Sequence, residues 1–138
     1  MIVDSAFTDL PSLAEELVEK GRAQGLFAPG FLVYIVMQFI RHSVSKLAGF
    51  DIQALSPIEH VSNCSIPVLF VTAEGDSFVP AHHTKKLFEK YAGEDKQMVV
   101  VDGDHNTPRP STFYQTASAF LTLYLKTLPV PVHELEHR

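Results

Sequence analysis

The chain has 138 residues, of which 46% are hydrophobic and 20% charged, a composition typical of one modest globular domain rather than a disordered segment. Its formal net charge is −5 and its 11 Lys and Arg are scattered along the sequence, so we exclude nucleic acid as a partner. Cys64 is the single cysteine and no signal-peptide pattern opens the chain, so we expect a reducing, cytoplasmic location.

The N-terminal residues predict a short strand followed by a helix. The apolar run of residues 1–3, ended by Asp4 and Ser5, is typical of a buried strand. The helix is predicted to begin after Ser12 as its N-cap, with Glu15 at the third helical position in a capping-box pattern.

A second and more apolar helix is predicted over residues 31–48 and is stopped by Gly49. Its unbroken apolar part, residues 31–40, is far shorter than the roughly 20 residues that a bilayer span needs. We therefore expect no transmembrane segment and interpret this helix as buried or substrate-facing.

The C-terminal half alternates strands and helices after an irregular stretch at residues 50–65. The six-residue run after Pro67, residues 68–73, and the segment of residues 96–101 predict buried strands, and an amphipathic helix closed by Gly93 lies between them. A last helix is predicted with Ser111 as its N-cap. Buried strands separated by helices imply an α/β fold with a parallel sheet of three strands.

Polar residues follow each predicted strand at its C-terminal end, where functional groups gather in open parallel sheets. One tip carries Asp4 and Ser5, the next ends in Asp76, and the third ends in His105. An Asp and a His on neighbouring tips can meet, so that the carboxylate orients the imidazole as a general base.

These tips carry a resemblance to a known family. The segments LFVTAEGDSFVP and DGDHNTPRP resemble the acid and histidine segments of the α/β hydrolases, and DSAFTDL and SPIEHVSNCSIPVLF extend the likeness over nearly the whole chain. The match is to a plant and protist group classed with serine peptidases and esterases of the S9 and S33 types. The resemblance implies that Asp76 is the acid and His105 the general base of a Ser-His-Asp triad.

The resemblance also implies a domain plan, which is the C-terminal part of an α/β-hydrolase fold. Residues 1–128 would form a partial domain with the last three strands of the family's sheet, residues 12–48 would form a small helical lid, and residues 129–138 would be a tail. The chain departs from the family because it has no G-x-S-x-G nucleophile elbow. We interpret it as a fragment: a truncated gene model, a transcript variant or a degenerate copy.

Other residues compete for the same roles less well. Asp102 and Asp104 lie on the same tip as His105 and are poorly placed to orient it, so we expect Asp104 to be structural. Ser5 lies at a strand tip and could replace the missing serine, but its neighbours include no glycine that would allow the strained elbow. Cys64 precedes a strand and so belongs at the N-terminal end of the sheet.

Two histidine-rich stretches raise the question of a metal. HELEH near the C-terminus, with His133 and His137, matches the zinc motif H-E-x-x-H, but it has no third ligand after it, so we interpret it as a chance match. We expect His82 and His83 to be solvated or capping residues rather than ligands. The sequence implies no metal and no cofactor.

Two function hypotheses remain. The first is the C-terminal portion of a serine hydrolase that acts on an ester, thioester or peptide bond of a small-molecule, acyl or peptide substrate, this chain alone being inactive. The second is a non-catalytic binding or regulatory module that uses residues 31–40 or the open sheet edge, which would also favour self-association.

Overall fold

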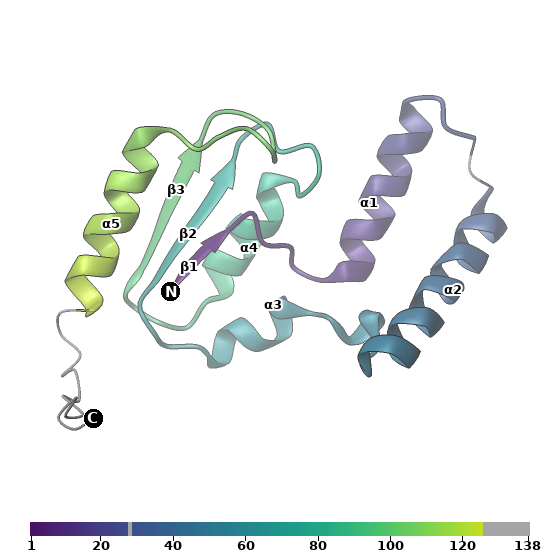
Figure 1. The fold of residues 1–138 in the computed structure, drawn as a ribbon, viewed down its shortest axis with the longest axis horizontal. Helices are drawn as coiled ribbons and strands as arrows, with labels where there is room; N and C mark the ends of the chain where they lie inside the picture. Colours follow the sequence, from purple (N-terminus) through teal and green to yellow (C-terminus); the bar gives the residue numbers. More distant parts are fainter. Residues whose placement is uncertain (28, 126–138) are drawn as a thin grey trace, which may run out of the picture.

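The computed structural model describes residues 1–27 and 29–125, and its centre is a parallel sheet of three strands (Figure 1). The strands are β1 (Ile2–Asp4), β2 (Val68–Ala73) and β3 (Lys96–Val101), and they lie in the order β1-β2-β3. The register pairs Phe70 of β2 with Val3 of β1 and Met98 of β3. The expected α/β class with three parallel strands is therefore confirmed.

Helices cover both faces of the central strand, which is why β2 is buried along its whole length. One face packs against α5 (Ser111–Leu125) and the other against α4 (Ala81–Lys90). Successive side chains of a strand point to opposite faces, so Leu69 and Val71 meet the α5 cluster while Val68 and Phe70 meet the α4 cluster. The predominance of apolar residues in β2, where Thr72 is the exception, is explained by this double burial.

The two other long helices form a pair that stands to one side of the sheet (Figure 1). They are α1 (Leu10–Ala23) and α2 (Gly30–Ala48). The predicted start of α1 is wrong by three residues: Asp9 is the N-cap, and its carboxylate accepts the backbone N–H of Ser12 at 2.8 Å. Asp is as favourable an N-cap as Ser, and a proline such as Pro11 is favoured in the first turn of a helix. The start of α1 therefore lies closer to the N-terminus than predicted.

Two other boundaries differ from expectation. Residues 50–65 contain short helical turns: η1 (Ile52–Ala54), α3 (Pro57–His60) and η2 (Val61–Asn63). Ser111 is the first residue of α5 rather than its cap. The predicted end of the second helix is confirmed, because Gly49 adopts a left-handed conformation with φ of 76°.

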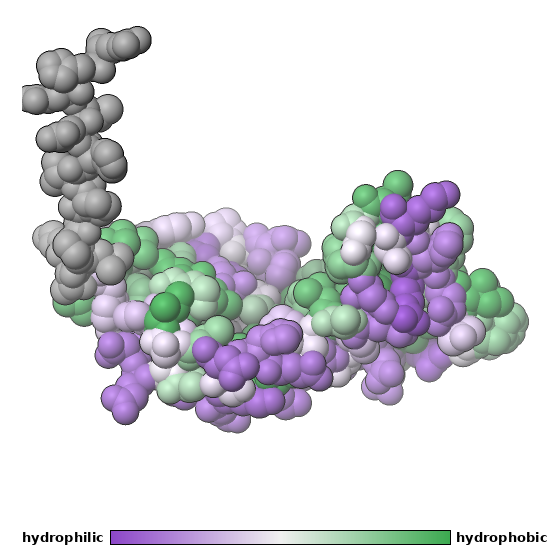
Figure 2. All heavy atoms as spheres, turned by 90° about the horizontal axis from the view of Figure 1, so that it is seen from below, coloured by the Kyte–Doolittle hydropathy of each residue, from purple (hydrophilic) through white to green (hydrophobic). Residues whose placement is uncertain are grey.

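Of the two interpretations of the apolar helix, burial is wrong, because no residue of α2 is buried, and a substrate-facing helix stays a prediction. Phe31 and Phe39 are 70% and 72% exposed. Figure 2 shows hydrophobic residues at the right-hand end of the molecule, where Figure 1 places α2. None of the helices in the described part of the chain is long and apolar enough to cross a membrane.

Candidate active site

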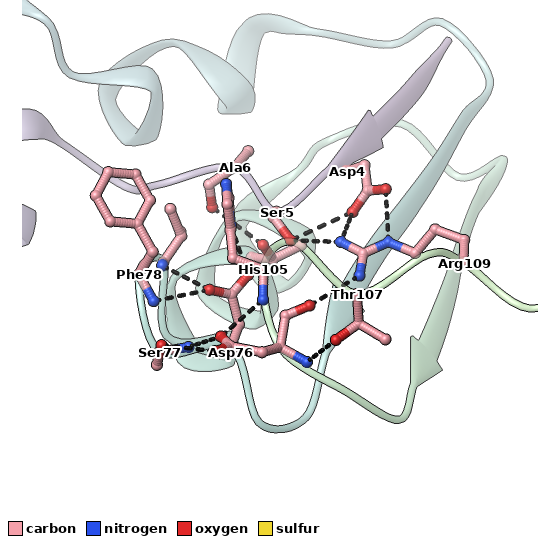
Figure 3. Close-up of polar contacts among 12 residues, drawn as sticks. Asp4, Ser5, Ala6, Asp76, Ser77, Phe78, His105, Thr107 and Arg109 are labelled. Atoms are coloured by element: carbon pink, nitrogen blue, oxygen red, sulfur yellow. Dashed lines mark hydrogen bonds and ion pairs between the residues drawn. The ribbon is translucent and has the colours of Figure 1, made fainter.

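The structure brings Asp76 and His105 together at the C-terminal ends of β2 and β3 (Figure 3). His105 Nδ1 lies 2.9 Å from Asp76 Oδ2. The carboxylate has no exposed surface, whereas the imidazole is 31% exposed. The bond through Nδ1 leaves Nε2 as the ring nitrogen available to an incoming group.

Asp76 is held as a carboxylate by several donors. Burial by itself would raise its pKa, but hydrogen bonds from His105, from the Val79 amide, from Ser5 and from the Phe78 amide lower the pKa below the ordinary value. The amides of Phe78 and Val79 donate to Oδ1 at 3.0 and 2.8 Å, which leaves Oδ2 for the imidazole. The acid is therefore ionised at neutral pH and fixes the ring orientation.

Two glycines allow the strand tips to approach closely enough for this pair. The Gly75 amide donates to the carbonyl of Gly103 at 3.0 Å, and a Cβ at Gly75 would lie 2.9 Å from that oxygen. Gly103 has a φ of +111°, and a Cβ there would lie 2.7 Å from Thr107. A side chain at Gly75 would push apart the two loops that carry the acid and the histidine, and one at Gly103 would displace Thr107 within the loop that carries the histidine.

Asp104 contacts the same loops without touching the imidazole. Its carboxylate accepts the Ser77 amide at 2.6 Å, the Ser77 hydroxyl at 2.9 Å and the His105 amide at 2.7 Å. The Ser77 amide, the His105 amide and the Ser77 hydroxyl lower the pKa of Asp104 to about 2. This geometry supports a structural role for Asp104, which ties the loop after β2 to the loop after β3.

We expect the tie made by Asp104 to weaken only in strong acid. A carboxylate whose pKa is lowered on folding contributes stability above its unfolded pKa, and loses that contribution as the pH falls toward its folded pKa, here about 2. An NMR titration should place the Asp104 midpoint near 2, and exchange of the Ser77 amide should accelerate below that pH. Asp104→Asn is the control, since the Ser77 amide of this variant should exchange fast at every pH. A titration midpoint of Asp104 at the ordinary value for Asp would contradict the persistence of these hydrogen bonds.

Ser5 adopts a strained backbone, which sequence reasoning missed. Its φ is 47°, and among the described residues no other non-glycine residue has a positive φ. Ser5 lies at the tip of β1. Its hydroxyl donates to Asp4 at 3.2 Å and accepts from Arg109 at 3.1 Å. The Ser5 side chain is also among the groups that lower the pKa of Asp76, so it contacts Asp4, Arg109 and the candidate acid.

Arg109 is a second residue at the site that sequence analysis did not identify. Its Nε and Nη2 donate to the two carboxylate oxygens of Asp4 at 3.0 and 2.8 Å, in a bidentate ion pair. The hydrogen bond to Asp4 is the largest contribution to the raised pKa of Arg109. The local sequence, an arginine between two prolines, does not indicate an ion pair, because the partner Asp4 lies near the other end of the sequence.

The remaining candidates lie apart from the pair. Cys64 precedes β2, at the opposite end of the strand from Asp76, as expected. The prediction for His83 is wrong: its side chain is 1% exposed, and it contacts Thr8 and Glu16. His82 is 44% exposed, in agreement with a solvated residue. HELEH and the predicted tail fall outside the described residues.

A cavity of about 460 Å³ lies between α1 and α2. Its lining includes Leu10, Val18, Val33 and Met37, with Glu19 and Arg22 at its polar side. None of its lining residues belongs to the loops that carry Asp76 and His105. The cavity is therefore a feature of the helical pair.

The order of strands and helices is similar to that of solved α/β hydrolases. An esterase from Pyrococcus furiosus superposes on 90% of the chain and 44% of its own, with a TM-score of 0.58 and 16% identity. An α/β hydrolase from a Medee basin deep-sea metagenome library covers 100% of the chain and 58% of its own, with a TM-score of 0.51 and 15% identity. At these identities the likeness concerns the fold.

The family is shown by sequence. Residues 3–138 match the family of the PhoPQ-activated pathogenicity-related protein, and the chain belongs to this family. The protein YqkD of Bacillus subtilis (strain 168) is 28% identical over 76 residues, which are 53% of this chain and 25% of YqkD. The chain thus spans about a quarter of this curated relative.

Proposed function

We propose that the chain is the acid- and histidine-bearing portion of a serine hydrolase that cleaves an ester, thioester or peptide bond. The observation that carries the proposal is the 2.9 Å contact between His105 Nδ1 and the fully buried Asp76 carboxylate. The similarity to solved esterases and α/β hydrolases supports the same class. The narrower likeness to the S9 and S33 types rests on the sequence segments alone.

The chemistry of this proposal assigns one role to each residue. A serine from a nucleophile elbow attacks the acyl carbon, and its proton passes to Nε2 of His105. Asp76 accepts from Nδ1–H and stabilises the imidazolium that forms. His105 then donates the proton to the leaving group. In the second half of the reaction a water attacks the acyl-enzyme, His105 accepts the proton of this water, and it returns the proton to the serine as the acid product leaves.

We expect this chain alone to show no significant turnover of p-nitrophenyl esters. An acid and a base without an oxygen nucleophile have nothing to activate, and Ser5 is bonded to Asp4 and Arg109. The purified chain and its His105→Ala variant should therefore give equal rates. Rapid turnover that disappears in His105→Ala, and in Ser5→Ala, would identify Ser5 as the nucleophile.

The decisive experiment is to sequence the transcript upstream of the Met1 codon. An in-frame G-x-S-x-G supports the proposal, and the longer protein should then react covalently with a fluorophosphonate probe at that serine. A separate promoter and an authentic start codon at Met1 would favour a second function, a non-catalytic binding module. The exposed apolar face of α2 is the observation that favours this alternative.

A further inference from the structure

Three potential metal ligands converge where α1 meets the start of α4. His82 Nε2 lies 3.0 Å from Glu16 Oε1, and His83 Nε2 lies 3.4 Å from Glu16 Oε2. The three groups offer ligand atoms that all lie within 4.8 Å of one another. Glu16 comes from α1 and the histidines come from α4, so the cluster joins two elements that are distant in sequence.

His83 is the residue that distinguishes this cluster from a surface ion pair. Its side chain is 1% exposed, and its Nε2 is one of the buried side-chain atoms without a hydrogen-bond partner in the described chain. Its Nδ1 accepts the Thr8 amide N–H at 3.3 Å and lies 2.7 Å from the Thr8 hydroxyl, so the ring is fixed from behind. Metal-ligating histidines donate the N–H of their second ring nitrogen to an acceptor. Binding a metal through Nε2 therefore requires the tautomer in which Nδ1–H donates to the Thr8 hydroxyl, whose own proton goes to Asp9 at 3.1 Å.

The buried ring of His83 directs its Nε2 toward Glu16, on the same side as His82. A neutral imidazole offers a lone pair to a metal ion. Lys20, one turn further along α1, donates instead to the Ser77 carbonyl at 2.6 Å and does not occupy the cluster.

We propose that Glu16, His82 and His83 bind a divalent transition-metal ion of the zinc type. Bonds of 2.0–2.2 Å in a tetrahedral site separate neighbouring ligand atoms by about 3.4 Å, close to the 3.0 and 3.4 Å between Glu16 and the two imidazoles. Two histidines and one carboxylate leave a fourth position for water. Imidazole and carboxylate together favour zinc over calcium or magnesium.

The metal would act as a cross-link between α1 and α4. α1 already contacts the loop after β2 through Lys20 and Ser77, and a metal on Glu16 adds a second attachment one turn away. The site would fix the position of the helical pair beside the loop that carries Asp76. This inference does not depend on the proposed hydrolase function, because it concerns a different set of residues.

The test is a titration of the full chain, first stripped with a chelator, with Co²⁺ followed by its visible absorption and with Zn²⁺ by equilibrium dialysis. Glu16→Gln and His82→Ala change exposed ligands and are expected to fold, while His83→Gln changes the buried one. Each should weaken Zn²⁺ binding by about 100-fold or more, because ligand loss costs at least as much as loss of a supporting residue. Zn²⁺ should also slow amide exchange in the central turns of α1.

The controls use the other histidines of the chain. His42→Ala and His60→Ala change exposed imidazoles outside the cluster, His105→Ala changes the candidate base, and the double variant His133→Ala/His137→Ala removes the HELEH histidines. All four should retain the affinity. Zn²⁺ binding that is lost in the HELEH variant or in His105→Ala but kept in His82→Ala and Glu16→Gln would overturn the proposal, as would the absence of saturable binding.

Discussion

Replacing His105 by alanine in a protein that joins this chain to a G-x-S-x-G segment should lower kcat by about 10⁴-fold or more, because the serine loses its base. Asp76→Asn should lower kcat by a similar order, since an amide cannot hold the imidazole tautomer in which Nε2 accepts the serine proton. Steady-state kinetics on an ester substrate, with active sites counted by a fluorophosphonate probe, would measure both losses.

Asp104→Asn is the matched control for Asp76→Asn, because it removes the same charge from the same pair of loops. The Asp104 carboxylate accepts from the amide of His105 and from the side chain and amide of Ser77, so the loss in kcat should be less than about tenfold. Equal losses in Asp76→Asn and Asp104→Asn would show that the acid has been assigned wrongly. Combining His105→Ala with Asp76→Asn should add little to either single loss, since triad residues act as a unit.

The second large effect concerns association. We expect the chain alone to self-associate, because β1 has no strand on its outer side in the described sheet and α2 exposes an apolar face. The edge offered by β1 is only three residues long, so α2 provides the larger surface. Sedimentation velocity over a concentration series should show a growing oligomer fraction.

A double variant, Phe31→Ser/Phe39→Ser, should shift the distribution toward monomer, and Leu123→Ser on α5 should not. Leu123 is also exposed, at 57%, but lies outside the α2 face. A monodisperse monomer with strong amide protection across residues 2–5 would contradict the prediction. The chain would then be a self-sufficient small domain that protects its own sheet edge.

The pairing of Asp76 with His105 could be predicted from sequence because it follows from topology. Apolar strands separated by helices imply parallel order, and parallel order brings the C-terminal tips of β2 and β3 to one edge. The expectation that Asp104 is structural followed from the same reasoning, since a residue next to His105 on the same strand tip is poorly placed to contact its imidazole. Local rules were sufficient where the partners follow neighbouring strands.

The residues that were missed depend on contacts between distant segments. His83 is buried by Thr8 and by α1. Thr8 lies 75 positions away from His83 in the sequence, and no local pattern indicates this contact. The pairing of Arg109 with Asp4 spans 105 positions. The exposure of α2 was missed for a related reason: an apolar helix indicates a need for burial, but a local pattern does not identify the surface that would cover it.

The acid and the histidine belong to one contiguous β2-α4-β3 unit, and the bond between them joins positions only 29 residues apart. Loops of this length close at small entropic cost, so the pair can assemble early, before β1 or the helical pair docks. The same contiguity makes the unit transferable: a gene duplication, a splice event or a designed fusion that keeps these residues together carries a preformed acid–base pair, and needs to acquire only a serine from elsewhere.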